Sequence, residues 1–204
     1  MLEAHELAAQ RGDAELFAGI DFALEPGAVL LVRGPNGSGK TTLLRILASV
    51  TRPAAGGVFW CGNPVGPFDA TLRANALFIG HAPALKDELT TEENLASLVS
   101  LHGADAGHGA LIKALDGWSL SRQRMLPARV LSEGQRRRIS LARLQLVPRT
   151  LWLLDEPAAA LDDGGVSTLA RILSLHAAVG GIAVIATHQD LPLAAGVGRS
   201  LRLE

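Results

Sequence analysis

This sequence has almost no cysteine and no long run of apolar residues. Cys61 is the only cysteine, which excludes an intramolecular disulfide and fits a reducing compartment. The apolar runs AVLLV (28–32) and LWLL (151–154) are far shorter than the roughly 18 residues that a membrane-spanning helix needs. We therefore expect any association with a membrane to occur through partner proteins.

An excess of positive charge is also lacking. Lysine and arginine number 19 against 20 aspartates and glutamates, and the run Arg136–Arg138 is too short to form a broad basic surface. We therefore expect no binding to nucleic acid. The first 16 residues carry acidic side chains where a secretory signal has a basic start and an apolar run, so we also expect no export.

The residues that are present indicate a compact α/β protein. Hydrophobic residues make up 48% of the chain and charged residues 19%, which are ordinary values for this class. Apolar patterns predict strands at 2–10, 16–24, 28–33, 56–62, 76–80, 150–155 and 182–187. They predict helices at 41–50, 93–102, 109–117, 133–146 and 166–179. The alternation of strand and helix predicts parallel pairing, with the helical stretch at about 87–148 inserted into one domain over 1–204.

A glycine-rich loop follows the predicted strand at 28–33. The segment RGPNGSGKTT (33–42) matches the pattern G-x-x-x-x-G-K-[ST] between a strand and a helix. In this pattern the backbone N–H groups face phosphate oxygens, Lys40 neutralises their charge, and the Thr41 hydroxyl is a ligand of Mg²⁺. The residues predicted to bind the phosphates of ATP are Gly34, Pro35, Asn36, Gly37, Ser38, Gly39, Lys40, Thr41 and Thr42.

Two adjacent carboxylates end the continuous apolar strand in LWLLDEP (151–157). The position of Asp155 at the end of the strand predicts a role in holding Mg²⁺, normally through water. Glu156 comes one residue later, where a carboxylate can accept a proton from the water that attacks the γ-phosphorus. Lys40 and Glu156 are therefore candidate catalytic residues.

Between these two motifs lies LSEGQRRR (131–138), which resembles the signature of the ABC ATPases, usually L-S-G-G-Q. The resemblance implies a P-loop domain with a mostly parallel core sheet, an antiparallel β edge and a helical subdomain. It also implies a head-to-tail homodimer that sandwiches two ATP molecules, with Ser132, Gly134 and Gln135 of one chain at the nucleotide of the other. Glu133 stands where the family has glycine, and we expect it to face solvent or a basic neighbour, since its charge is unfavourable beside phosphate.

Further family motifs match elsewhere in the chain. Ala160, Leu161 and Asp162 resemble the D-loop that communicates between the two sites. His188 in ATHQ (186–189) resembles the switch histidine that contacts γ-phosphate. The adenine base is usually stacked on an aromatic residue before the second strand, where this chain has Arg11 and contains no tyrosine at all. A planar guanidinium can stack on a purine, so Arg11 is the candidate for this contact.

His81 occupies the place of the family's Q-loop glutamine, in the segment IGHAPALK (79–86). That glutamine reaches Mg²⁺ or the attacking water and moves with the transmembrane partner. Magnesium prefers oxygen ligands, so we expect His81 to act through water rather than by direct coordination.

Three segments narrow the resemblance to one subfamily. GHAPALK (80–86), TLWLLDEP (150–157) and LARLQL (141–146) are similar to the ATP-binding subunits of the haem exporter for cytochrome c maturation. The resemblance implies an ATPase on the cytoplasmic face of the inner membrane, paired with integral-membrane subunits and coupled to haem export or to release of a haem-loaded chaperone.

The sequence has no C-x-x-C-H pattern, so we expect no direct binding of haem. Three alternatives remain open: an ATPase of another small-molecule transporter, a soluble ABC protein that is not a transporter, and a binding module with an inactive site.

Overall fold

The computed structural model describes residues 1–193 and 198–204, which form two compact units. The first unit comprises 1–78, 149–156 and the described residues from Leu173 onward. The second comprises 79–148 and 157–172, and it includes the predicted helical stretch at about 87–148. No helix within the described ranges is both long and apolar enough to span a bilayer.

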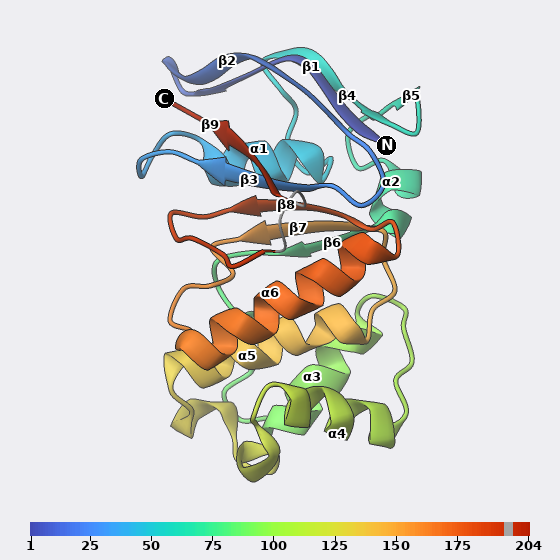
Figure 1. The fold of residues 1–204 in the computed structure, drawn as a ribbon, viewed down its shortest axis with the longest axis vertical. Coiled ribbons are helices and arrows are strands. Elements are labelled where there is room, and N and C mark those ends of the chain that lie inside the picture. Colours follow the sequence, from blue (N-terminus) through green and yellow to red (C-terminus); the bar gives the residue numbers. More distant parts are fainter. Residues whose placement is uncertain (194–197) are drawn as a thin grey trace. The chain divides into compact units, whose positions relative to one another are not determined.

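The first unit contains two sheets with helix α1 (Lys40–Leu47) between them (Figure 1). Four strands form a sheet of order β2-β1-β4-β5 with antiparallel pairs, and five form a sheet of order β6-β7-β8-β3-β9, in which β3, β7, β8 and β9 pair in parallel. The strands are β1 (Leu2–Arg11), β2 (Ala14–Leu24), β3 (Val29–Arg33), β4 (Ala55–Trp60), β5 (Asn63–Pro64), β6 (Ala76–Ile79), β7 (Leu151–Asp155), β8 (Ile182–Ala186) and β9 (Gly198–Arg202).

The strand sequences explain this arrangement. Every residue of β7 and β8 is buried, as expected for continuous apolar strands in the middle of a parallel sheet. Helix α1 buries Leu43, Leu44 and Leu47 in a core that also contains apolar residues of both sheets. One core therefore holds the strand before the glycine-rich loop and the helix after it.

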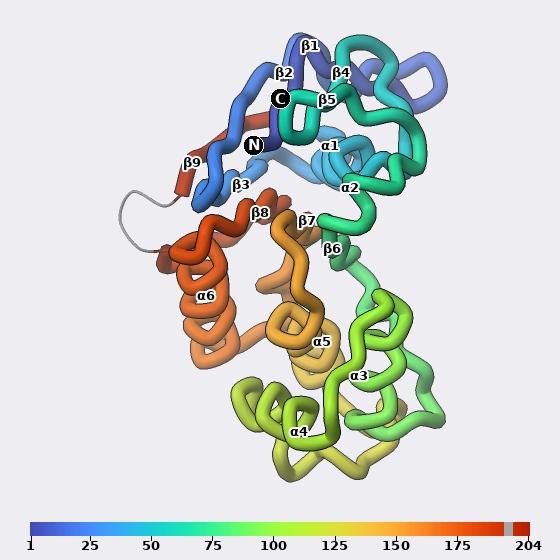
Figure 2. Tube along the Cα trace, turned by 90° about the vertical axis from the view of Figure 1, so that its right-hand side faces the viewer, coloured from blue at the N-terminus to red at the C-terminus, as the bar shows by residue number. Residues whose placement is uncertain are grey.

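The second unit contains helices α3 (Thr91–Ser100), α4 (His108–Gly117) and α5 (Glu133–Ala142), which lie together in Figure 2, and the first part of α6 (Asp163–Ala178). Thr90 and Glu93 form a reciprocal capping box at the start of α3, the pattern expected of a threonine followed three residues later by a glutamate. The hydrogen bonds from the backbone and then the side chain of Thr90 lower the pKa of Glu93.

Some elements differ from the sequence prediction. The helix expected to reach Leu146 is α-helical only to Ala142, after which a 3₁₀ turn, Arg143–Gln145, tightens the chain before Pro148. Helix α2 (Ala70–Asn75), with Asp69 as its N-cap, and strand β9 were not predicted.

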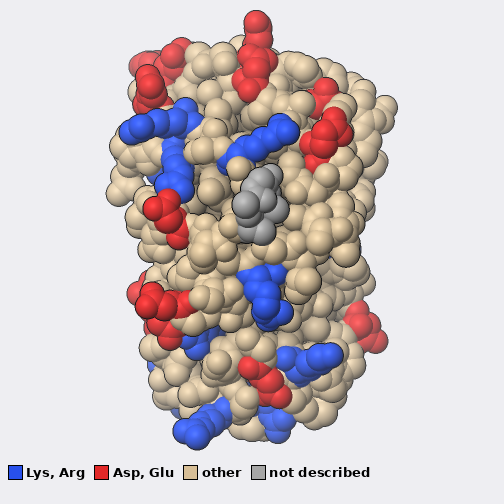
Figure 3. Space-filling view, viewed as in Figure 1, with Lys and Arg blue, Asp and Glu red and all other residues tan. Residues whose placement is uncertain are grey.

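On the face drawn in Figure 3, the basic and acidic side chains of the described residues are interspersed.

Candidate functional site

The glycine-rich loop joins β3 to α1 and is closed by its own lysine. Lys40 is only 8% exposed, and its Nζ donates hydrogen bonds to the carbonyl oxygens of Gly34 (2.8 Å) and Pro35 (3.0 Å). Gly39 precedes α1 in a left-handed conformation, and no side chain caps the helix. The first N–H groups of α1 are thus placed as in helix N-termini that bind anions.

Two glycines of the loop are required by its geometry. A Cβ at Gly34, where φ is +151°, would lie 2.5 Å from the carbonyl oxygen of Leu203. At Gly39, where φ is +90°, it would lie 2.9 Å from Phe17 Cδ1 and 3.1 Å from Leu16 Cβ. The start of β2 therefore packs directly against the loop at Gly39, and a side chain at either glycine would force its neighbours to move.

An oxygen pair joins α1 to the end of β7. Thr41 Oγ1 donates a hydrogen bond of 2.9 Å to Oδ2 of Asp155, which is only 4% exposed. A hydroxyl and a buried carboxylate are both oxygen ligands of the kind that Mg²⁺ uses together with substrate phosphates. Within the described ranges no cluster of three or more His, Cys, Asp or Glu residues could hold a metal. The oxygens of Thr41 and Asp155 fit a magnesium ion whose other ligands come from substrate phosphates and water.

Glu156 and His188 meet beyond the ends of neighbouring parallel strands. Asp155 of β7 pairs with Ala186 of β8, so the residues that follow emerge at the same edge of the sheet. Glu156 has a left-handed backbone (φ +47°), and its N–H donates to the Ala186 carbonyl oxygen at 2.9 Å. Its Oε2 lies 3.0 Å from His188 Nδ1, with the glutamate side chain 15% and the histidine side chain 62% exposed. The Glu156 carboxylate and the His188 imidazole therefore lie side by side at this edge of the sheet, and the pair could accept a proton.

The signature segment begins α5 in the second unit. Ser132 Oγ accepts from the Gln135 N–H, and the Ser132 N–H donates to Gln135 Oε1, so the two form a capping box. Glu133 is exposed, which confirms the expectation that it faces solvent. A Cβ at Gly134 would lie 2.5 Å from the carbonyl oxygen of Ala160, so the signature contacts the predicted D-loop through backbone atoms.

Asp162 connects the predicted D-loop to the same helix. Its Oδ1 accepts hydrogen bonds from the Gly165 N–H (2.8 Å) and from Arg138 Nη2. These bonds, with the backbone bond from Gly165 as the larger cause, lower the pKa of Asp162. The carboxylate is therefore held as an anion on the surface of the second unit.

The remaining two site predictions fall on exposed positions. His81 lies two residues beyond β6 with an exposed side chain. Arg11 is exposed at the end of β1, where a turn leads into β2. Leu16, which packs beside Gly39 together with Phe17 on that second strand, is a further residue near the loop that the sequence did not single out, because its apolar side chain also fits a place in the core.

The predicted site residues are thus divided between the two units. The first unit contains the glycine-rich loop, Arg11, Asp155, Glu156 and His188, and the second contains His81, the signature and Asp162. The Ala186 carbonyl that orients Glu156 was also missed, because its role depends on strand register rather than on residue type.

Comparisons with known proteins agree on one family. A family model described as ABC transporter matches residues 17–159. The cytochrome c biogenesis ATP-binding export protein CcmA of Aromatoleum aromaticum is 48% identical over 195 residues, covering 95% of this chain and 91% of that protein. The protein of the same name from Dechloromonas aromatica is 44% identical over 203 residues and the full length of both chains.

The fold agrees with solved structures. The ATP-binding cassette MJ0796, in a dimeric post-hydrolysis state with ADP and Pi, superposes with a TM-score of 0.83 at 24% identity, covering 100% of this chain and 94% of that one. The predicted fold class, an ABC-type P-loop domain, is therefore confirmed. By its sequence and its fold, this chain belongs to the ABC transporter family of ATP-binding proteins, within the group of cytochrome c biogenesis ATP-binding export proteins.

Proposed function

We propose that this protein is the ATP-hydrolysing subunit of an ABC transporter complex for cytochrome c maturation. The observation that carries the ATPase proposal is the set of side chains at the carboxyl ends of β7 and β8. Thr41 bonds to Asp155, and Glu156 lies against His188. In the sheet, β8 lies between β7 and β3, the strand that leads into the glycine-rich loop. Membership of the family and the chain's relatives support the same activity.

The phosphates of ATP would bind at the glycine-rich loop. There the N–H groups at the start of α1 face the anion, and Lys40 exchanges the carbonyls of Gly34 and Pro35 for phosphate oxygens. Thr41 and Asp155 would hold Mg²⁺, which supplies charge neutralisation at the phosphates. The remaining loop residues, from Pro35 to Gly39 and Thr42, shape this cradle through their backbone.

Glu156 is the candidate general base. Its backbone is fixed by the bond to Ala186, which sets the position from which the side chain extends. His188, mostly exposed and 3.0 Å away, would orient that carboxylate and contact the γ-phosphate. Water positioned by Glu156 would lose its proton to the carboxylate as it attacks the phosphorus.

A second copy of the chain would complete each nucleotide site. The exposed Ser132 and the backbone at Gly134 begin α5, where helix N–H groups favour a phosphate supplied from a partner copy. Gln135 caps the same turn, and Asp162 would communicate between the two sites. The dimeric, ADP- and Pi-bound state of the cassette MJ0796 supports this arrangement. Arg11 would stack on adenine at the mouth of the loop.

The transport role follows from the subfamily. The relatives at 44–48% identity are cytochrome c biogenesis export proteins, which supports coupling of hydrolysis to haem export or to release of a haem chaperone. The integral-membrane subunits would bind at the helical stretch of about 87–148, on the cytoplasmic face of the inner membrane. His81, at the entrance to that stretch, would sense water near the γ-phosphate and relay that state to the membrane subunits.

The experiment that tests this function combines a biochemical and a cellular readout. We expect Lys40→Ala to remove Mg²⁺-dependent ATP hydrolysis by the complex and to abolish accumulation of c-type cytochromes in cells that lack the wild-type gene. Arg52→Ala, at an exposed arginine that belongs to none of the motifs, is the matched control and should retain both. Normal cytochrome c with an inactive Lys40→Ala subunit would instead favour another small-molecule transporter.

A further inference from the structure

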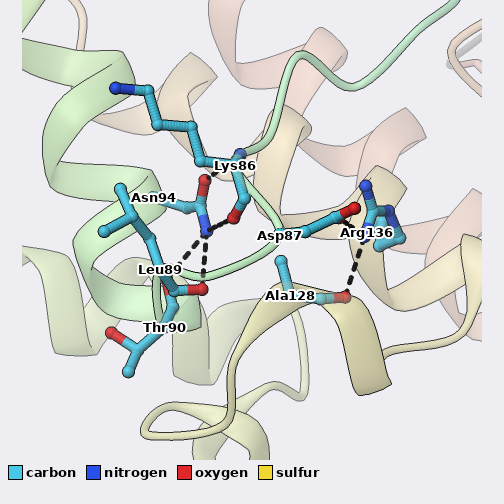
Figure 4. A network of polar contacts seen from close by, with 7 residues as sticks. All are labelled: Lys86, Asp87, Leu89, Thr90, Asn94, Ala128 and Arg136. Carbon is cyan, nitrogen blue, oxygen red and sulfur yellow. Dashed lines mark hydrogen bonds and ion pairs between the residues drawn. The ribbon is translucent and has the colours of Figure 1, made fainter.

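The three consecutive arginines at 136–138 lie in α5, directly after the signature, and reach different segments of the second unit. Arg136 Nη1 donates to Asp87 Oδ1 (2.6 Å) and to the Ala128 carbonyl oxygen (2.9 Å), as Figure 4 shows. Arg138 bonds to the D-loop carboxylate described above. Both carboxylate partners are more than half exposed, and ion pairs of this kind contribute about 0–1 kcal/mol.

Arg137 differs from its two neighbours in burial and in the groups it binds. It is only 3% exposed. Its Nη1 donates to the carbonyl oxygens of Gly80 (2.8 Å) and His81 (3.1 Å), and its Nε donates to the carbonyl oxygen of Pro157 (3.3 Å). One guanidinium therefore holds the backbone at His81 and the backbone that directly follows Glu156 in the chain.

The segment after His81 is held at its far end as well. Asn94, buried in α3, accepts from the Lys86 N–H and donates to the carbonyl oxygens of Lys86, Leu89 and Thr90 (Figure 4). Between the two anchors, Ala84 has a left-handed backbone with φ of +57°. The loop at 80–86 is thus fixed to α5 at its start and to α3 at its end.

We infer that Arg137 is a positioning residue that joins the backbone of Gly80–His81 to that of Pro157, so that both segments and the signature helix α5 move together. The inference rests on the proposed function, since it assigns a task to the loop that carries His81. A displacement of this loop would be transmitted through one side chain to the helix that begins with the signature and to the D-loop segment. Contact with membrane subunits could in this way alter the nucleotide site.

The chemistry of arginine suits this task. The guanidinium has five N–H donors in a planar fork, so it can bind carbonyls of two segments at once, whereas a lysine ammonium is a single point on a flexible stem. The charge of Arg137 also affects a neighbouring arginine: the burial of Arg143 itself, and secondly the charge of Arg137, lower the pKa of Arg143 to about 10. Burying a second arginine beside the first is unfavourable, which argues that position 137 is not arginine merely to fill space.

Hydrogen exchange of the nucleotide-free chain tests the bridge directly. We expect Arg137→Lys, which keeps the charge but cannot hold both segments, to accelerate exchange about tenfold in peptides covering 79–86 and 157–162, the loss of roughly one charged hydrogen bond in each. Arg136→Lys is the matched control and should leave both peptides at the wild-type rate. Acceleration in one segment alone, or an equal acceleration throughout α3 and α4, would overturn the inference.

The wild-type protein offers a test that needs no variant. On addition of Mg²⁺ and ATP, the peptides covering 79–86 and 157–162 should change their exchange rates together if Arg137 joins them. A change in one segment with no change in the other would contradict the bridge, even if Arg137→Lys failed to fold.

Steady-state kinetics of the complex with its membrane subunits test the consequence for turnover. Arg137→Lys should lower kcat about tenfold with an unchanged KM for ATP, because the glycine-rich loop is untouched. An unchanged kcat, or an equal effect on kcat and KM, would refute the positioning role. If the wild-type complex itself failed to hydrolyse ATP, the proposed function would fail, while the exchange experiments would still decide whether the bridge exists.

Discussion

The hydrogen bond between Thr41 and Asp155 allows a quantitative prediction that separates stability from catalysis. Thr41→Ala removes the hydroxyl that donates to Oδ2 of a carboxylate only 4% exposed, where water cannot readily take its place. A hydrogen bond to a charged group contributes about 1.5–3 kcal/mol, and alanine recovers about 0.5 kcal/mol through its higher helix propensity. The expected net loss is about 1–2.5 kcal/mol of the free energy of unfolding.

Thermal unfolding followed by circular dichroism measures this loss. For a chain of this size, about 2–4 °C corresponds to each kcal/mol, so the midpoint of Thr41→Ala should fall by about 2–10 °C without nucleotide or metal. Thr41→Ser keeps the hydroxyl and is the control, which should unfold within about 2 °C of wild type.

The same two variants should also differ in the Mg²⁺ concentration that they need for ATP hydrolysis. Thr41→Ala should need a higher Mg²⁺ concentration for half-maximal hydrolysis than Thr41→Ser, because only the serine retains an oxygen ligand. If both variants unfold at the wild-type temperature, the bond to Asp155 does not stabilise the fold. If both lose hydrolysis equally, the hydroxyl is not a ligand.

Two further predictions concern groups that bind or lose protons. Glu156→Gln keeps the shape of the side chain but cannot accept a proton, so phosphate release should fall about 10²–10⁴-fold while binding of a fluorescent ATP analogue persists; an equal loss of binding would contradict the general-base role. His176 is buried against Trp152, with ring centroids 3.6 Å apart, and burial lowers its pKa even though a bond to the Ile182 carbonyl opposes this. The unfolded chain therefore binds a proton at this histidine more readily than the folded chain does. The free energy of unfolding should fall as the pH drops below about 6.5, the ordinary histidine pKa. His176→Phe should flatten this pH dependence, measured by urea denaturation between pH 7.5 and 5.5.

Much of the fold follows from local patterns. The uninterrupted apolar runs of β7 and β8 predict central parallel strands, and the threonine and glutamate three residues apart predict the start of α3. The glycine-rich loop is also recognisable, because its pattern requires particular residue types at particular positions. Helix α2 and β9 escaped prediction because they are short or largely exposed, so little hydrophobic periodicity marks them.

The sequence alone determined which side chains are available: a phosphate-binding loop, the carboxylates Asp155 and Glu156, and a histidine after β8. These depend on residue type and spacing, which are properties of the chain itself. Tertiary structure decided their relations. Parallel register brings Glu156 to His188, and packing aims the buried guanidinium of Arg137 at three carbonyl oxygens. Since any carbonyl can accept such a bond, only the folded backbone specifies which ones do.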